Sequence, residues 1–335
     1  MIPGLDLDAL HAYLSANLPR YAGRLEARRI AGGKSNLTYW LSDGEQQWVL
    51  RRPPLGPLTP SAHDMAREFR VVERLAPTPV PVAPALLLCE DPAVLGVPFA
   101  ITGFVDGRVI RSAADAAALS PAEQRDCAFE LIHRLAELHA VDPASVGLDP
   151  TRADGYLARQ VRRWSGQWER VRTRDDEAPL ELARRLQAQL PARSDRAIVH
   201  GDYRLDNVLL AHDRCALLAI VDWEMSTLGD PLADLGLSLV YWDPMTEPVL
   251  GVPHIRAGET GFPDADAMAQ RYAARSGRAI ERLGFYVALG CFKLAVIAEG
   301  IHQRYLAGDT VGDGFSTIGE AVPVLLAAGL EQLPA

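Results

Sequence analysis

Three polar side chains in the middle of the chain, Asp202, Asn207 and Asp222, have the types and spacing needed for chemistry on a phosphate. Residues 198–210 read I-V-H-G-D-Y-R-L-D-N-V-L-L, and A-I-V-D-W-E follows after a short predicted hairpin. Transfer of a phosphoryl group from ATP depends mainly on positioning and on neutralising charge. The reaction needs a carboxylate beside the acceptor hydroxyl, and Asp202 can supply it. An amide and a second carboxylate, Asn207 and Asp222, suit Mg²⁺, which prefers oxygen ligands.

Each of these residues has an ordinary structural explanation when it is taken alone, because an Asp after a strand usually caps a turn. The combination is more informative. Asp202 and Asn207 have the D-x-x-x-x-N spacing of a kinase catalytic loop, and Asp222 ends an apolar strand one hairpin later. His200 is expected to support the loop rather than to react. The sequence therefore predicts catalysis by Asp202 and metal binding by Asn207 and Asp222.

Residues 31–36 read A-G-G-K-S-N and contain the Gly-Lys-Ser triplet of a phosphate-binding P-loop. The P-loop pattern G-x-x-x-x-G-K-[ST] requires a glycine at position 28, which is an arginine, and a helix where the sequence predicts a hairpin. Two readings then compete: a plain turn between strands, and a turn whose backbone N–H groups cover a nucleotide phosphate, as in kinases. The second, which we favour, predicts contacts from Gly33, Ser35 and Asn36 and leaves Lys34 in solvent.

Length and hydrophobic periodicity predict two lobes in this chain of 335 residues, of which 48% are hydrophobic. Residues 1–105 contain one internal helix, opened by Thr59 and Pro60, and five strand-like runs at 25–30, 37–42, 47–51, 85–89 and 98–105. Helical patterns dominate residues 106–335. We therefore predict an α+β fold, in which an N-terminal five-stranded antiparallel sheet with a helix precedes a mostly helical C-terminal lobe.

The composition bears on partners and location. A net charge of −9 disfavours nucleic acid and anionic membranes as partners. The N-terminal residues show no signal-peptide pattern, and the longest apolar runs, such as 283–298, are expected to be too short and too interrupted to span a bilayer. We expect buried free thiols and a cytoplasmic location, because the cysteines are far apart in apolar stretches. They are Cys89, Cys127, Cys215 and Cys291.

The run H-G-D-Y-R-L-D-N, followed by V-D-W-E and G-D-P-L-A-D-L, resembles the aminoglycoside phosphotransferase and choline kinase family, which has a protein-kinase-like fold. G-G-K-S-N-L-T-Y, W-V-L-R-R-P-P and F-K-L-A-V-I-A-E-G-I-H-Q-R are similar to the branch of kinase-like domains fused to acyl-CoA dehydrogenases. The resemblance covers nearly the whole chain. It implies an ATP- and Mg²⁺-dependent phosphotransferase acting on a hydroxyl of a small molecule.

The resemblance also implies roles for residues outside these motifs. Arg51 stands where the family has a strand lysine that contacts the α- and β-phosphates, and Glu68 matches the helix acid that pairs with it. Thr102 and Phe104 lie in the stretch that matches the hinge, whose backbone hydrogen-bonds adenine. Asp234 matches an acid that braces the catalytic loop. An arginine in place of the lysine is a departure, because a guanidinium fork is not equivalent to an ammonium point charge.

The acceptor stays open at this point. A protein kinase is disfavoured, because Gly229-Asp230-Pro231 follows Asp222-Trp223-Glu224 closely and leaves no room for an activation segment. The fused branch implies a hydroxylated acid or acyl-CoA, and the wider family implies an aminoglycoside or a choline-like alcohol. The arginines of residues 159–174 favour an anionic acceptor or simply form a solvated helix face. The alternative of another class is a nucleotide-binding pseudokinase, favoured by Arg51. The oligomeric state is not predicted.

Overall fold

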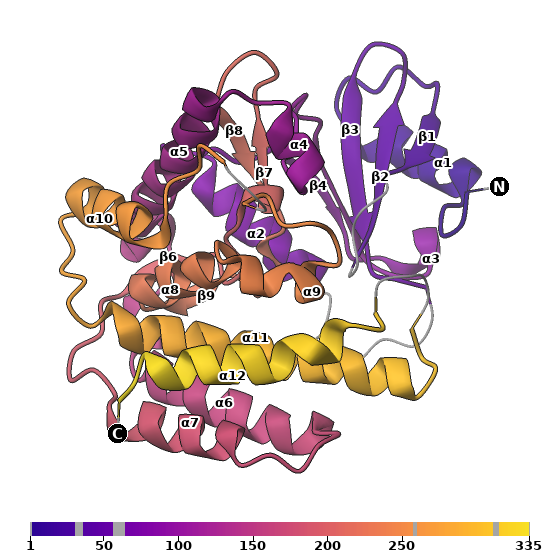
Figure 1. Cartoon of the computed structure of the whole chain (residues 1–335). Helices are drawn as coiled ribbons and strands as arrows, with labels where there is room; N and C mark the ends of the chain where they lie inside the picture. The colour runs from indigo at the N-terminus through magenta and orange to yellow at the C-terminus, as the bar shows by residue number, and fades with distance from the viewer. Residues whose placement is uncertain (1, 31–35, 56–63, 257–259, 311–314, 335) are drawn as a thin grey trace. The chain divides into compact units, whose positions relative to one another are not determined.

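The computed structural model describes residues 2–30, 36–55, 64–256, 260–310 and 315–334 of a chain that folds into two compact units. Unit 1 comprises Met1–Gly107 and Leu218–Ser226, and unit 2 comprises Arg108–Leu217 and Thr227–Ala335 (Figure 1). The segment Leu218–Ser226 therefore clusters with the N-terminal residues, although the sequence placed it in the second lobe. This segment carries Asp222.

Unit 1 is built on a five-stranded antiparallel sheet with the strand order β1-β2-β3-β5-β4. Its turn between β2 and β3 contains Gly44, whose φ of 93° favours a residue without a side chain. The alternation of side chains along β3 buries Trp48 and Leu50 and directs Arg51 to the opposite face of the sheet. The strands are β1 (Glu26–Arg29), β2 (Leu37–Ser42), β3 (Gln47–Arg52), β4 (Ala85–Cys89) and β5 (Phe99–Gly103).

Among the described residues of unit 1, three α-helices accompany this sheet: α1 (Leu7–Asn17), α2 (Met65–Leu75) and α3 (Pro92–Leu95). Leu10 and Leu14 of α1 are fully buried in one apolar cluster with side chains of the sheet. Helix α2 is capped by Asp64, whose carboxylate accepts the N–H of Arg67 at 2.9 Å. The helix start predicted at Thr59 and Pro60 lies outside the described residues, and the observed cap is Asp64 instead.

Unit 2 is mostly helical, and its longer elements surround a short pair of antiparallel strands, β6 (Ala197–Val199) and β9 (Thr227–Gly229). Strand β7 (Val208–Leu210) belongs to this unit, and β8 (Leu217–Ile220) begins at the boundary with unit 1. The predicted α+β fold class is confirmed. The helices are α4 (Ala113–Ala117), α5 (Pro121–Ala140), α6 (Tyr156–Val171), α7 (Ala178–Ala188), α8 (Pro231–Tyr241), α9 (Glu247–Leu250), α10 (Ala265–Ser276), α11 (Leu283–Leu306) and α12 (Ala321–Glu331).

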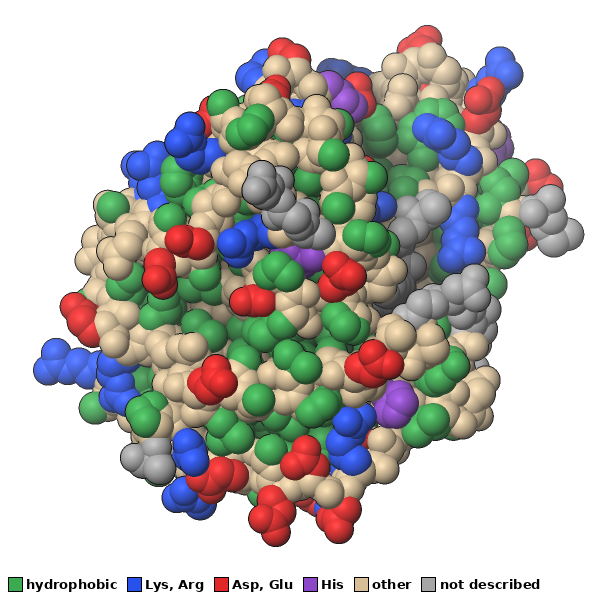
Figure 2. Space-filling view, in the orientation of Figure 1, with side chains coloured by type: hydrophobic (Ala, Val, Ile, Leu, Met, Phe, Trp, Pro, Cys, Tyr) green, Lys and Arg blue, Asp and Glu red, His purple; other side chains and the backbone are tan. Residues whose placement is uncertain are grey.

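Helix α11 is longer than the apolar run 283–298 suggested. It has 24 residues and is long and apolar enough to cross a membrane, so the expectation that this run is too short is wrong. Burial explains its apolar character, because 72% of its most apolar window lies inside the structure. Figure 2 shows acidic, basic and apolar side chains intermixed over the visible face of the helices of unit 2. We therefore describe α11 as a core helix of unit 2.

Two of the four cysteines form a disulfide, which corrects the expectation of four free thiols. Cys127 of α5 is bonded to Cys215, 88 residues later, with their Cα atoms 4.7 Å apart. The sequence did not reveal this pair, because the loop before β8 brings Cys215 to α5 only in the folded chain. Cys89 and Cys291 are free and buried, as expected. The cysteines therefore give no support to the expectation of a reducing compartment.

Helices α8 and α11 cross closely at two glycines. A Cβ on Gly236 of α8 would lie 2.5 Å from the carbonyl carbon of Tyr286 in α11. A Cβ on Gly290 of α11 would lie 3.1 Å from the Cα of Leu237. Because real Cβ atoms do not approach a backbone atom to 2.5 Å, a side chain at position 236 would force the two helices apart.

We predict that Gly236→Ala lowers the free energy of unfolding by about 1–3 kcal/mol, the usual cost of overpacking a core. Urea unfolding followed by circular dichroism measures it. Gly166→Ala in α6 is the matched control, because the nearest atom outside that helix's own backbone lies 3.8 Å from the added Cβ. Since alanine favours helix, the control should be neutral or stabilising by up to about 1 kcal/mol. Equal losses in both variants would contradict the crossing as the cause.

Candidate active site

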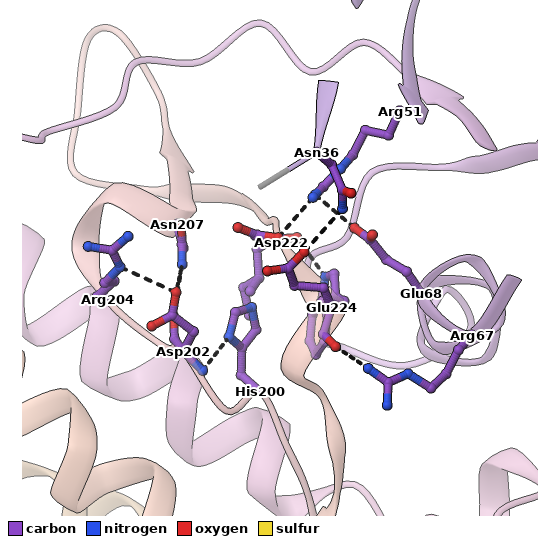
Figure 3. A network of polar contacts seen from close by, with 12 residues as sticks. Asn36, Arg51, Arg67, Glu68, His200, Asp202, Arg204, Asn207, Asp222 and Glu224 are labelled. Carbon is purple, nitrogen blue, oxygen red and sulfur yellow. Dashed lines mark hydrogen bonds and ion pairs between the residues drawn. The ribbon is translucent and has the colours of Figure 1, made fainter. Parts of the chain in front are cut away.

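Unit 1 contains a cluster of charges built around Arg51. Its Nη1 lies 2.7 Å from Oε1 of Glu68, and its Nη2 donates to Oδ1 of Asp222 at 2.9 Å (Figure 3). Strand β3 supplies Arg51, helix α2 supplies Glu68, and the turn after β8 supplies Asp222. Three residues that are far apart in the sequence, each predicted as a site residue, therefore meet in one ion-pair network. The guanidinium fork explains how one side chain holds two carboxylates.

The backbone at Asp222 has φ 66° and ψ 60°, a left-handed conformation that is uncommon for residues other than glycine. Such conformations cost free energy and persist where surrounding contacts enforce them. At Asp222 the ion pair with Arg51 provides such a contact. The side chain keeps 32% of its surface exposed, so its carboxylate stays accessible to a cation.

Burial and neighbouring charges shift the pKa values in this cluster. Burial raises the pKa of Glu68 to about 7; Arg51 opposes the shift, whereas the negative charges of Asp222 and Glu224 add to it. Burial alone would lower the pKa of Arg51, but Glu68 and Asp222 outweigh it and raise the pKa above its usual value. The guanidinium therefore remains charged, and Glu68 titrates near neutral pH.

Glu224 and Arg67 also belong to this cluster, although the sequence did not single them out. Oε2 of Glu224 accepts a hydrogen bond from Nδ2 of Asn36 at 3.1 Å, and the backbone carbonyl of Glu224 accepts one from Arg67 of α2 (Figure 3). Asn36, predicted as a nucleotide contact, is buried, and its side chain is already engaged. Glu224 could have been found from its place in the V-D-W-E motif.

Other predicted nucleotide contacts have different outcomes. Gly33 and Ser35 lie outside the described residues. Thr102 is at the end of β5, where it pairs with Val49 of β3. The N–H of Phe104 donates to the carbonyl of Gln47 at 3.2 Å, so Phe104 would offer adenine its carbonyl oxygen. The adenine contact of Thr102 and Phe104 stays a prediction.

Unit 2 contains the predicted catalytic loop. Nδ2 of Asn207 donates to Oδ2 and to the backbone carbonyl of Asp202, both at 2.9 Å (Figure 3). Because both amide protons serve Asp202, the amide oxygen is the atom of Asn207 left to bind a cation. His200 is fully buried, and its Nδ1 accepts the N–H of Asp202 at 3.3 Å. This contact agrees with the supporting role predicted for His200.

Asp234 of α8 binds the backbone of the catalytic loop. Its carboxylate accepts the N–H of His200 at 2.6 Å and the N–H of Gly201 at 2.7 Å. Nε2 of buried His139 lies 3.3 Å from Oδ2 of Asp234, and Nδ1 of His139 lies 2.7 Å from the hydroxyl of Tyr272. Burial by itself would raise the pKa of Asp234, but His139, His200 and the N–H of Gly201 outweigh it and lower the pKa. The bracing predicted for Asp234 thus appears as a buried hydrogen-bond network.

Two cations that the sequence missed lie beside Asp202. Nε of Arg204 is 3.4 Å from Oδ2 of Asp202, and Lys293 of α11 donates to the carbonyl of Gly201 at 2.6 Å. Burial favours a higher pKa for Asp202, but Arg204, Lys293 and His200, with the hydroxyl of Tyr241, outweigh it and lower the pKa. Asp202 is therefore held as a carboxylate. Arg204 lies within the catalytic motif, whereas Lys293 is 91 positions downstream of Asp202.

The predicted metal ligands carry oxygen atoms of the kind that Mg²⁺ prefers. Among the described residues, no group of three or more His, Cys, Asp or Glu could hold a metal ion. Mg²⁺ does not need such a group, because it is usually held by one or two carboxylates together with substrate phosphates and water. The amide oxygen of Asn207 and the exposed carboxylate of Asp222 are hard oxygen ligands of this kind.

The chain matches the model of the phosphotransferase enzyme family over residues 26–273 and belongs to that family. It is 36% identical over 337 residues to acyl-CoA dehydrogenase family member 11 of Gallus gallus, a match that covers 97% of the chain and 43% of the relative. The chain therefore spans less than half the length of this relative. The predicted likeness to kinase-like domains of acyl-CoA dehydrogenases is confirmed.

Two solved structures extend the comparison. A Ralstonia eutropha JMP134 protein named "putative aminoglycoside phosphotransferase" has a TM-score of 0.84 and 32% identity, covering 98% of both chains. A thermostable mutant of aminoglycoside phosphotransferase APH(4)-Ia, in a ternary complex with AMP-PNP and hygromycin B, has a TM-score of 0.62 and 16% identity, covering 96% of this chain and 99% of the other. The second shows the shared fold alone. Family and fold together make the chain a small-molecule kinase with a hydroxyl acceptor.

We predict that Glu68 makes stability depend on pH. Its pKa of about 7 lies above the ordinary value of 4.5, so folding favours the protonated form. This stabilisation is fully present below about pH 4.5 and is lost as the pH rises through about 7. Urea unfolding of the wild type and Glu68→Gln from pH 4.5 to 8 should show the wild type losing stability relative to the variant. Glu73→Gln, an exposed position on the same helix, is the control and should run parallel to the wild type. A parallel course for Glu68→Gln would contradict the prediction.

Proposed function

We propose that the chain transfers the γ-phosphate of ATP to a hydroxyl of a small acidic molecule, in a reaction that requires Mg²⁺. The observation that carries this proposal is the Asp202 carboxylate, which is bonded to Asn207 and flanked by the cations Arg204 and Lys293. Asp202 accepts the proton of the acceptor hydroxyl as the new phosphorus–oxygen bond forms. The bond to the β,γ-bridging oxygen breaks, and ADP leaves with that oxygen.

The nucleotide is proposed to use groups of unit 1. Arg51 serves the phosphates and is oriented by its pair with Glu68. Gly33, Ser35 and Asn36 supply the phosphate-covering turn. Thr102 and Phe104 supply the adenine contact. Asn207 and Asp222 bind Mg²⁺, which when bound neutralises phosphate charge. The AMP-PNP bound to the APH(4)-Ia mutant supports a nucleotide in this fold.

The charges near Asp202 favour an anionic acceptor. Arg204 and Lys293 lie beside the carboxylate that would receive the proton, and both would attract an acidic group on the acceptor. Arg204 also pairs with Asp206 at 3.1 Å, so Lys293 contributes the greater part of this attraction. The arginines of α6 add less to this argument, because Arg159, Arg162, Arg163, Arg170 and Arg172 are exposed. A hydroxylated acid or acyl-CoA fits these charges, and the name of the relative from Gallus gallus is consistent with such a molecule.

We also propose an alternative acceptor, an alternative class of protein and a cellular location. An aminoglycoside or choline-like alcohol is the alternative acceptor and is disfavoured by the same two cations. A nucleotide-binding pseudokinase is the alternative of another class, and its motivation weakens because Arg51 still pairs with Glu68. A cytoplasmic location is still proposed, although the disulfide between Cys127 and Cys215 removes the argument from free thiols, and the lack of nucleic-acid and membrane partners rests on the net charge of −9.

A screen of acceptors tests the function directly. Purified protein is incubated with Mg²⁺ and either ATP or GTP, and nucleotide diphosphate release is followed with hydroxy acids, hydroxyacyl-CoAs, amino alcohols and aminoglycosides. The proposal expects release with an acidic acceptor. Release with aminoglycosides or amino alcohols alone would support the alternative acceptors. No release with any acceptor, together with a thermal shift caused by ATP and Mg²⁺, would favour the pseudokinase.

We predict that Asp202→Ala abolishes phosphate transfer while ATP still stabilises the protein. The variant removes the carboxylate that accepts the hydroxyl proton, and such proton transfer contributes about 10²- to 10⁴-fold to rate. Asp213→Ala is the matched control, because Asp213 lies in the loop after β7 and is exposed. Diphosphate release and thermal shift with ATP are measured side by side. Wild-type turnover in Asp202→Ala would show that the catalytic base is elsewhere.

We also predict that the phosphate-binding cation is Arg51 and not Lys34. Arg51→Ala should raise the KM for ATP by about tenfold or more, since a charge-assisted hydrogen bond contributes about 1.5–3 kcal/mol. Lys34→Ala should change this KM less than twofold, the scale of a solvated loop cation. Steady-state kinetics at saturating acceptor decide between them. The opposite pattern would restore a P-loop-like role for Lys34.

A further inference from the structure

Both backbone groups of Gly201, the residue before Asp202, are held by charged side chains, of which Asp234 is buried and Lys293 is partly buried. Its N–H donates to Oδ1 of Asp234 at 2.7 Å, and its carbonyl accepts from Nζ of Lys293 at 2.6 Å. Gly201 has a φ of 83°, a conformation that glycine adopts readily. The freedom that glycine would otherwise have is removed at this point by one anion and one cation. The direction in which the chain enters Asp202 is thereby fixed.

Asp234 and Lys293 lie on α8 and α11, near the point where these two helices cross. Asp234 lies two residues before Gly236, and Lys293 lies three residues after Gly290, on the same side of its helix. The two glycines let the helices approach closely. Nζ of Lys293 lies 5.7 Å from the centre of the Trp164 ring of α6, which adds a cation–π contact.

A lysine is a costly choice at this position. Lys293 follows Phe292 and precedes Leu294, both buried, and it is one of two lysines in the chain. Burial lowers its pKa, and the carboxylates Asp202 and Asp234 offset part of that effect. An apolar side chain of similar length would usually pack in a helix core at lower free-energy cost. The charged end of Lys293 reaches out of this apolar stretch to the Gly201 carbonyl.

We infer that Lys293 is a positioning residue for phosphate transfer, which fixes the Gly201 peptide group and thereby aims the Asp202 carboxylate at the acceptor hydroxyl. This inference rests on the proposed function. Lys293 acts through the Gly201 carbonyl and by its charge near Asp202, whereas Asp234 holds the opposite side of the same residue. Loss of the lysine should affect the rate of transfer more than the binding of ATP, because the groups proposed to bind the nucleotide lie in unit 1.

Three variants test this inference. Lys293→Met keeps the length of the side chain and removes the charge and the donor. Lys293→Arg keeps both. Arg304→Met is the matched control, because Arg304 is an exposed cation on the same helix. ADP release from MgATP is measured with water alone and with each hydroxy acid of the acceptor screen, and hydrogen–deuterium exchange is measured in peptides that span 198–210.

We expect Lys293→Met to lower kcat on the order of 10- to 100-fold, the cost of a misplaced catalytic group, with the KM for ATP within about twofold of wild type. Exchange in 198–210 should quicken. Lys293→Arg should recover most of the rate, and Arg304→Met should match the wild type. Unchanged kcat and exchange in Lys293→Met, or equal losses in Arg304→Met, would overturn the inference.

Misfolding of Lys293→Met and inactivity of the wild type each have a defined consequence. If Lys293→Met does not fold, Lys293→Leu replaces it, because leucine also removes both the charge and the donor and favours helix, and a wild-type kcat in that variant overturns the inference. If the wild type transfers phosphate to no acceptor, the proposed function fails by itself. Hydrogen–deuterium exchange then still decides whether Lys293 holds the loop.

Discussion

The carboxylate of Asp234 accepts the backbone N–H groups of His200 and Gly201, and the geometry of the catalytic loop depends on these two hydrogen bonds. The bonds are inside the protein, where an unpaired N–H or an unpaired carboxylate costs several kcal/mol. The conformation of the loop that pairs these N–H groups with the Asp234 carboxylate is therefore favoured over conformations that leave them unpaired. His139 extends the network to α5, and the crossing of α8 and α11 adds Lys293 on the opposite side of Gly201.

Arginine can occupy position 51 because its guanidinium group pairs with two carboxylates at once. A site for a phosphorylated nucleotide must keep carboxylates ionised near a cation, in surroundings that disfavour charge. Arg51 contacts Glu68 and Asp222 through different nitrogens of one planar group, so it orders β3, α2 and the turn after β8 together. A lysine would offer the same charge from a single atom. The arginine thus changes the geometry of the pairing without removing it.

Local patterns predicted much of this fold. Alternation placed the five strands, and the helical patterns beyond residue 106 correspond to the helices of unit 2. The arrangement of Asp202 and Asn207 could also be predicted locally, because both residues belong to one short loop. Predictions failed where the cause lies far away in the chain. Cys127 and Cys215 are joined across 88 positions, and Lys293 donates to the carbonyl of Gly201, 92 positions upstream.

The sequence by itself determined the fold class, the family and the residue types available for phosphate transfer, because periodicity, turns and motif spacing are local properties of a chain. Tertiary structure alone decided which charges meet. It brought Arg51 to Asp222, gave Glu68 a pKa near 7 through burial, and set Lys293 against Gly201. The physical reason is that the strength of a charge interaction depends on distance and on burial, and both are set by how distant segments pack.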